Sequence, residues 1–214
     1  MTPQGLRPLR MMAMTKYKVC LDAGHFGKYN RSPCNKEYYE SEMSWKLHLF
    51  LKKELEALGF DVRLTREKVE DDPALFDRGA MSGRLGAVMF LSIHSNAPGG
   101  NPSDERYPKV RGAETFYSVS DCEGNAPIAR DLTDAVVRTM GTEDRGIKTR
   151  RYPDNESVDY YQVLRAAAAS GCKRAFLIEH GFHTNPEDSA FLQDSECLAR
   201  LAKAEADILD DFFD

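Results

Sequence analysis

The sequence predicts a single α/β domain built on a mostly parallel, twisted sheet with helices on both faces. Two kinds of segment alternate along the 214-residue chain. Short, nearly continuous apolar runs are typical of strands covered on both faces, and longer segments with an apolar residue every three or four positions are typical of amphipathic helices. Such alternation favours parallel strands joined by crossover helices. One domain of this length can bury roughly 70% of the unfolded surface, which is sufficient for a core.

The first elements lead to a histidine and a glutamate. Residues 17–21 form a short buried strand that ends in Asp-Ala-Gly-His-Phe-Gly, so the strand delivers His25 to a tight turn. Residues 28–39 are polar and are predicted as a loop. From Glu40 the apolar residues recur with helical spacing up to Gly59, which ends the helix. Glu40 projects on the buried face of this helix, where a carboxylate requires a partner.

The rest of the chain continues the alternation. The other predicted strands have apolar or alternating patterns and are residues 60–65, 87–95, 112–119 and 175–179. The other predicted helices have helical apolar spacing or many alanines and are residues 73–85, 125–140, 161–170 and 198–212. Residues 98–108, with two glycines and three prolines, are predicted as a surface loop, and residues 141–160 as mostly loop.

The composition argues against several classes of protein. The formal net charge is −5, from 29 Lys and Arg against 34 Asp and Glu, and no block of five like charges occurs, which argues against nucleic-acid binding. No apolar run approaches the roughly 20 residues of a membrane span. The five cysteines form no Cys-x-x-Cys pair. We therefore expect reduced thiols, a reducing compartment, and neither a disulfide framework nor a thiolate zinc site.

The N-terminal segment is expected to lie outside the domain. Residues 1–15 are predicted to be an extension that is disordered or not native, since the patterned sequence begins at residue 16 and Met14 could be the start. The apolar stretch of residues 11–14 is shorter than the about 7–15 residues of a secretory signal. We therefore place the domain at residues 16–214 and expect synthesis in the cytoplasm without a recognisable signal peptide.

Four polar residues stand where strands end or a helix begins. His25, His94 and Glu179 end or follow apolar strands, and Glu40 opens a helix. Functional groups of α/β sheets gather at the carboxyl ends of the strands, so we expect these side chains to lie close together. Two histidines and one carboxylate are a frequent ligand set for catalytic zinc, with a fourth position left for water. The pattern therefore indicates a hydrolytic metal site.

Other polar residues have less specific interpretations. His180 is adjacent to the strand-end glutamate and points to the opposite face, where a packed or supporting role is expected instead of ligation. His183 lies in the following loop and is either structural or a contact to substrate or zinc-bound water. Asn96 is either a turn former or a substrate contact. His48 is expected to be solvated, and Trp45 to be a packed helix residue or part of a glycan surface.

Short motifs in a fixed order make the chain similar to a known family. Besides the glutamate that opens a helix nineteen residues before Gly59, the motifs are Leu21-Asp22-Ala23-Gly24-His25, Leu64-Thr65-Arg66, Ser92-Ile93-His94-Ser95-Asn96-Ala97, Arg145-Gly146-Ile147-Lys148, Val163-Leu164-Arg165 and Ile178-Glu179-His180-Gly181-Phe182-His183-Thr184-Asn185-Pro186. Each motif is short, but their order is specific. From residue 16 to the C-terminus the chain resembles the zinc-dependent N-acetylmuramoyl-L-alanine amidases of the amidase 3 type.

The resemblance implies a cofactor, a substrate and four site residues. His25, Glu40 and His94 match the zinc ligands of that family, and Glu179 matches its catalytic glutamate. The implied reaction hydrolyses the amide between the lactyl group of N-acetylmuramic acid and the L-alanine of the peptidoglycan stem peptide. Zn²⁺ would activate water, and Glu179 would accept the proton and pass it to the departing amine. Peptidoglycan is therefore the expected partner, and the cell wall is the expected place of action.

Several alternatives stay open. Glu37 and Glu42 lie close to Glu40, although Glu40 has the better spacing and helix face. The same ligands could serve a different zinc amidohydrolase or a peptidase. A non-catalytic wall-binding protein is a third interpretation, against which the complete set of ligands and Glu179 argues. The route to the wall is open as well, and the alternatives are a phage or prophage endolysin, export by another route, or a shortened form of a longer enzyme.

Overall fold

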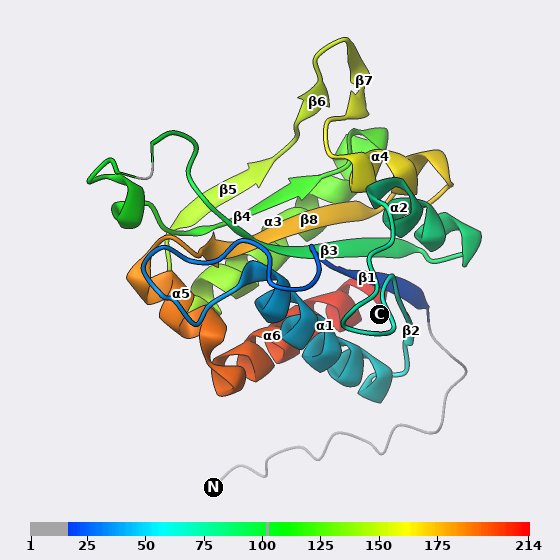
Figure 1. The fold of residues 1–214 in the computed structure, drawn as a ribbon. Helices are drawn as coiled ribbons and strands as arrows, with labels where there is room; N and C mark the ends of the chain where they lie inside the picture. The colour runs from blue at the N-terminus through cyan, green and yellow to red at the C-terminus, as the bar shows by residue number, and fades with distance from the viewer. Residues whose placement is uncertain (1–16, 102) are drawn as a thin grey trace, which may run out of the picture.

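A six-stranded sheet organises residues 17–101 and 103–214, which are the residues that the computed structural model describes (Figure 1). Its strands are β1 (Lys18–Ala23), β2 (Asp61–Leu64), β3 (Met89–Asn96), β4 (Ala113–Tyr117), β5 (Asp144–Lys148) and β8 (Ala175–Phe182). Their order in the sheet is β2-β1-β3-β8-β4-β5. The first four are parallel, β4 is antiparallel to β8, and β5 is parallel to β4. The predicted α/β class with a mostly parallel sheet is confirmed.

Helices cover both faces of the sheet, as predicted (Figure 1). One face carries α1 (Glu40–Ala57), α3 (Cys122–Met140), α5 (Pro186–Gln193) and α6 (Ser195–Phe213), and the other carries α2 (Leu75–Arg84) and α4 (Gln162–Ala169). The alternation of side chains along the strands produces two apolar clusters. Leu21 belongs to the larger one, with α1, α3 and α6, and its neighbour Cys20 belongs to the smaller one, with α4.

The connections of β1 create a crevice at the carboxyl ends of the parallel strands. The chain leaves β1 through α1 to β2 on one side, and then crosses through α2 to β3 on the other side of β1. Helices α1 and α2 therefore lie on opposite faces of the sheet, and the reversal of strand order between β1 and β3 is the topological switch point where α/β proteins bind ligands.

Residues 141–160 are more regular than the sequence predicts. They contain β5 at the sheet edge and a hairpin of β6 (Arg151–Tyr152) and β7 (Asn155–Asp159), which projects above the sheet in Figure 1. The loop prediction is wrong here because β5 has the sequence Asp-Arg-Gly-Ile-Lys, whose pattern is not that of a buried strand. Only its position beside β4 makes it a strand.

Helix α5 is a second element that the sequence analysis missed. The Asn185 side chain accepts hydrogen bonds from the backbone N–H groups of Glu187 and Asp188, and Pro186 occupies the first turn. This Asn-Pro start is a recognisable helix signal, so the helix was predictable from the residues.

Three further observations concern the chain as a whole. The predicted extension of residues 1–15 lies outside the described residues. All five cysteines are free thiols. None of the helices in the described part of the chain is long and apolar enough to cross a membrane.

Candidate active site

The loop after β1 brings His25 against β3. His25 has a backbone φ of 59°, the left-handed region that few non-glycine residues adopt. The preceding Gly24 lies beside His94, because Ala23 is paired in register with Ile93. A Cβ atom on Gly24 would lie 2.4 Å from Cε1 of His94. The absence of a side chain at Gly24 therefore allows the two histidines to approach each other.

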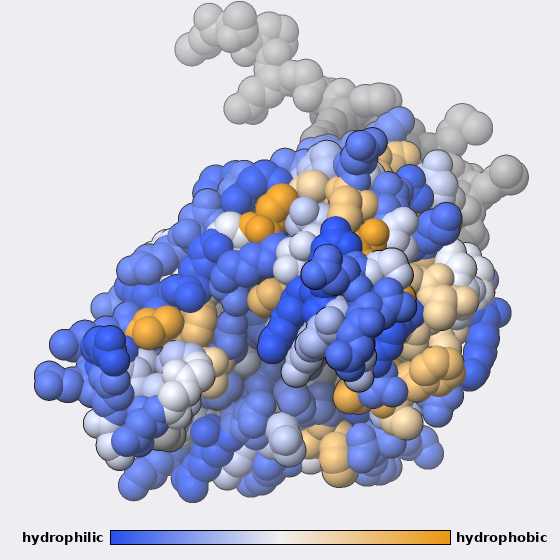
Figure 2. All heavy atoms as spheres, turned by 90° about the horizontal axis from the view of Figure 1, so that it is seen from above, coloured by the Kyte–Doolittle hydropathy of each residue, from blue (hydrophilic) through white to orange (hydrophobic). Residues whose placement is uncertain are grey.

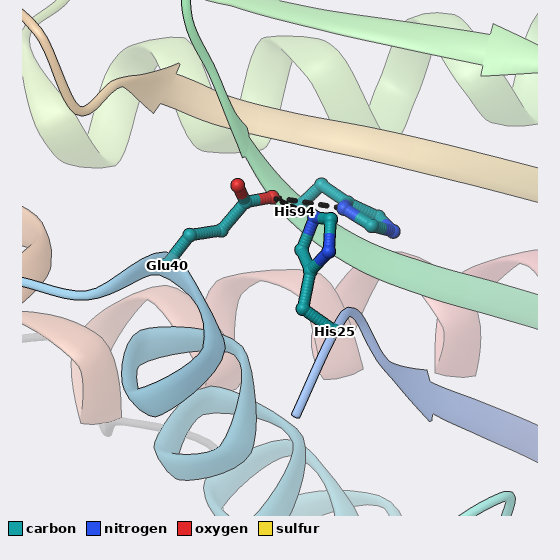
Figure 3. A group of neighbouring side chains, drawn as sticks. All are labelled: His25, Glu40 and His94. Carbon is teal, nitrogen blue, oxygen red and sulfur yellow. Dashed lines mark hydrogen bonds and ion pairs between the residues drawn. The ribbon is translucent and has the colours of Figure 1, made fainter. Parts of the chain in front are cut away.

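Three of the predicted site residues form a cluster at the crevice. Figure 3 shows His25, Glu40 and His94 pointing toward one another from the β1 loop, the start of α1 and the end of β3. Oε1 of Glu40 lies 2.9 Å from Nδ1 of His94 and 3.3 Å from Nε2 of His25. One ligand atom of each residue lies within 4.8 Å of those of the other two. Glu40 is buried, and Nδ2 of Asn30 donates to its Oε2 atom at 2.6 Å.

The electrostatics of Glu40 keep this carboxylate charged. Burial alone would raise its pKa, but the hydrogen bonds with His25 and His94, together with the charges of these two residues, outweigh burial and hold the pKa far below its ordinary value. The backbone N–H of Ser95 also donates to Oε1 of Glu40, at 3.1 Å. A buried negative oxygen is therefore held between two imidazole rings.

A chain of hydrogen bonds behind His94 determines which ring nitrogen faces the cluster. Oγ of Ser92 donates to Oδ2 of Asp22 at 2.7 Å, so it must accept the N–H of His94 Nε2, which lies 3.1 Å away. Nδ1 of a neutral His94 then carries a lone pair toward the carboxylate of Glu40. The two facing atoms are then satisfied by a proton or by a metal ion between them, and two imidazoles with one carboxylate form a donor set that fits zinc.

Asp22 anchors this chain of hydrogen bonds. Burial alone would raise the pKa of Asp22, but the Arg78 guanidinium and hydrogen bonds from Thr65 and Ser92 lower it. Nη1 of Arg78 lies 3.2 Å from Oδ1 of Asp22, and Oγ1 of Thr65 donates to the same oxygen at 2.6 Å. The aspartate of the first motif therefore supports His94 indirectly.

Glu179 lies next to the cluster. It is paired in register with His94 on β3 and with Glu114 on β4, so the three residues form a row across the sheet. Within the described residues, no group forms a hydrogen bond with its buried Oε2 atom. Burial, followed by the charges of Glu40 and Glu114, raises the pKa of Glu179 well above its ordinary value. A carboxyl group with a free oxygen and a raised pKa is suited to proton transfer.

One cavity of about 480 Å³ contains all four predicted site residues. Its rim is apolar, because Phe26, Tyr29 and Leu75 line it with exposed fractions of 41%, 51% and 55%. The Tyr29 ring stacks on that of His25, with 4.5 Å between the centroids. The rim therefore offers an apolar surface beside a polar floor.

The other histidines have structural partners. His180 is buried, as expected, with Nδ1 at 3.1 Å from the carbonyl oxygen of His94 and Nε2 at 2.9 Å from Oε1 of Glu205. His183 lines the cavity, and its Nδ1 atom lies 3.0 Å from the carbonyl oxygen of Ser95.

The prediction that His48 is solvated is wrong. The residue is fully buried, and its ring lies 4.5 Å from that of Trp45. The Arg66 guanidinium folds over the Trp45 ring at 5.0 Å, so a residue that follows β2 covers this part of α1. Trp45 accordingly has the packing role that was one of its two interpretations.

Sequence reasoning missed two polar residues of the site. Asn30, which supports Glu40, lies in a polar loop that carries no pattern. Glu114 is buried and accepts a hydrogen bond from Nδ2 of Asn96 at 2.9 Å. A glutamate on the apolar strand β4 was a usable signal, because a carboxylate on a buried face requires partners.

Comparisons with known proteins match this chain to amidases. The family model described as N-acetylmuramoyl-L-alanine amidase matches residues 19–211. The N-acetylmuramoyl-L-alanine amidase CwlM of Bacillus licheniformis is 28% identical over 193 residues, which cover 88% of this chain and 66% of CwlM. The chain thus spans slightly less than two thirds of the length of that relative.

Solved structures share the fold. Cwp6 from Clostridium difficile has a TM-score of 0.78 and 26% sequence identity, and the match covers 94% of this chain and 30% of Cwp6. An N-acetylmuramoyl-L-alanine amidase from Clostridium difficile 630 has a TM-score of 0.76, and the match covers 92% of this chain and 97% of the amidase chain. At 23% identity, that second likeness shows the fold alone.

Proposed function

Because the chain belongs to the N-acetylmuramoyl-L-alanine amidase family, we propose that it is a zinc-dependent peptidoglycan amidase that acts on the cell wall. It hydrolyses the amide bond between N-acetylmuramic acid and the L-alanine of the stem peptide. One observation carries the proposal. A single cavity holds two imidazoles, an ionised carboxylate and a second carboxyl group with a free oxygen.

The proposed zinc ligands are His25, Glu40 and His94. When bound, zinc supplies Lewis acidity that activates water and polarises the scissile carbonyl group. The protein contributes the orientation of the ligands. Ser92 accepts the N–H of His94 Nε2 and leaves Nδ1 free for the metal, and Asn30 holds the second oxygen of Glu40.

Glu179 is the proposed general acid–base group. It accepts a proton from the attacking water and returns that proton to the nitrogen of the departing amine, which leaves poorly unless it is protonated. The free Oε2 atom is the site that receives the proton. The raised pKa of Glu179 favours this role, because a group of ordinary acidity would return the proton less readily.

The decisive variant is Glu179→Gln. The amide has the shape of the carboxyl group, so the fold and the zinc content are expected to stay unchanged, while amine release from purified peptidoglycan falls about 10²–10⁴-fold. Glu143→Gln, at an exposed position before β5, is the matched control and should keep wild-type activity.

Three outcomes would contradict this assignment. Activity of Glu179→Gln within about threefold of wild type, at equal zinc occupancy, would remove Glu179 from the proton transfer. Loss of zinc from that variant would indicate that Glu179 is a zinc ligand. Cleavage of free peptides as efficiently as of muropeptides would indicate a zinc peptidase in place of an amidase.

A further inference from the structure

A second cavity adjoins the candidate active site on the side of β4 and β5. Its volume is about 390 Å³, and it shares Asn96, Ala97 and Tyr161 with the cavity that contains the zinc-ligand cluster. It lies over Phe116 and beside the loop that leads from β5 into the β6–β7 hairpin. A substrate bound at the cluster can therefore extend into it along a continuous surface.

This second cavity is basic in a chain of net charge −5. Arg145 and Arg150 line it, and Nζ of Lys148 lies 5.9 Å from the centroid of the Phe116 ring in its wall. Glu114 is the one carboxylate among the described residues that line it. Oε2 of Glu114 accepts from Nε of Arg145 at 3.1 Å and also from Lys148. One carboxylate thus serves two cations, and a third cation adds to the positive charge.

Arg150 is the cation that is free to bind an anion. Among residues 17–101 and 103–214, no carboxylate lies within ion-pair distance of it. Its guanidinium lies 3.7 Å from the ring centroid of Tyr160 and 5.7 Å from that of Tyr161. Stacking on a ring holds the guanidinium plane in place and leaves N–H groups at its edge for a carboxylate.

We propose that Arg145, Lys148 and Arg150 form a carboxylate-binding subsite for an acidic stem peptide. The inference rests on the proposed function, because it assumes that the peptide leaves the scissile bond toward β4. The residue after L-alanine in a stem peptide is D-glutamate joined through its γ-carboxyl group, so its α-carboxylate is the charged group nearest to the scissile bond. The subsite therefore prefers peptides with this α-carboxylate free over peptides in which it is amidated.

The surface on the side of the hairpin is suited to a polar ligand. Figure 2, which looks down on the side of the sheet where the hairpin projects in Figure 1, shows a mostly hydrophilic surface with separate apolar patches. The side chain of Lys148 is 38% exposed and that of Arg145 is 33% exposed, so a carboxylate can reach both without a rearrangement of the sheet. Charge-assisted hydrogen bonds at such half-exposed positions are strong enough to discriminate substrates but remain sensitive to salt.

The experiment compares two synthetic substrates that differ in one charge. They are N-acetylmuramoyl-L-alanyl-D-glutamate γ-methylamide, with a free α-carboxylate, and its α-amide. The zinc-loaded wild type is expected to cleave the first with a kcat/KM about tenfold higher. In Arg150→Gln most of this preference should be lost. The kcat/KM for the substrate with the free α-carboxylate should fall, and the kcat/KM for the α-amide should stay unchanged. Arg151→Gln, which changes the neighbouring exposed arginine on β6, should retain the preference.

A binding measurement separates this inference from the proposed function. Calorimetry with L-alanyl-D-glutamate γ-methylamide should show binding about tenfold weaker for zinc-loaded Arg150→Gln than for zinc-loaded wild type, and the α-amide peptide should bind both equally. Equal kcat/KM for the two substrates, or equal peptide binding by the two proteins, would overturn the subsite. If neither substrate is hydrolysed but peptide binding still depends on Arg150, the proposed function is overturned and the subsite is not.

Discussion

Glu40 differs from its acidic neighbours in burial and in partners. Its side chain is 2% exposed and contacts both histidines, whereas Glu37 is exposed and lies with Glu42 beside a separate small pocket. We expect Glu40→Gln to weaken zinc binding more than about tenfold, because it removes a charged ligand. Glu37→Gln and Glu42→Gln are the matched controls. Metal analysis after dialysis against a zinc buffer checks this, and a larger loss from either control would show that the ligand is misassigned.

His48 predicts a pH dependence of stability. Burial lowers its pKa to about 4, while the unfolded chain has the ordinary value of about 6.5. Between these values the unfolded chain binds the extra proton, so the free energy of unfolding decreases as the pH falls from 6.5 to 4 and is unaffected above about pH 7. Protonation of His48 lowers the free energy of unfolding by at most about 3 kcal/mol.

The variant His48→Gln isolates this effect. Urea unfolding of zinc-free protein at pH 7.5, 5.5 and 4 should show a steeper loss of stability for the wild type than for the variant. Working without zinc keeps proton competition for the metal ligands out of the comparison. Parallel pH profiles for the two proteins would contradict the assigned pKa.

At the scale of the element, the contact between the β1 loop and β3 depends on Gly24. The Cβ atom of Gly24→Ala would overlap the His94 ring, which carries a proposed ligand atom. We expect the variant to fold with a loss of about 1–3 kcal/mol and to bind zinc poorly, because the ring must move. Gly99→Ala is the control, since no atom lies within 4 Å of its added methyl group. Zinc affinity equal to that of the control would show that His94 tolerates the displacement.

At the scale of the whole molecule, the proposed ligands connect three separate parts of the chain. They lie in the loop after β1, at the start of α1 and on β3. Zinc that binds the folded chain alone should therefore stabilise it by about 2.7 kcal/mol at a hundredfold excess over Kd, or roughly 5–10 °C in Tm for a domain of this size.

Chelation provides the test. A chelator should abolish amine release and lower Tm by this amount, and added zinc should restore both. Glu40→Gln should show no comparable shift in Tm with zinc. A wild-type Tm that is insensitive to chelator and zinc would argue that these three residues do not hold a metal.

The local pattern of apolar and polar residues was sufficient to predict most of the architecture. The buried strand of β1, the helical spacing from Glu40 and the apolar strand that ends at His94 were all predictable, because side-chain burial repeats with the period of the backbone. The order of short motifs was sufficient for the family. The positions of polar residues at strand ends and at a helix start had already selected the four candidate residues that the structure brings into one cavity.

Tertiary structure alone decided the features that depend on residues far apart in the chain. Strand β5 exists because β4 offers an edge to a segment with little apolar pattern of its own. Glu179 acquires its raised pKa from burial in the folded chain and then from the charges of Glu40 and Glu114, which lie 139 and 65 positions earlier in the chain. His48 lies on the buried face of α1 with Ser44 and Leu51, and Arg66, which follows β2, lies over the neighbouring Trp45 ring. Burial and charge are set by all neighbours in space, and a linear pattern records only the neighbours along the chain.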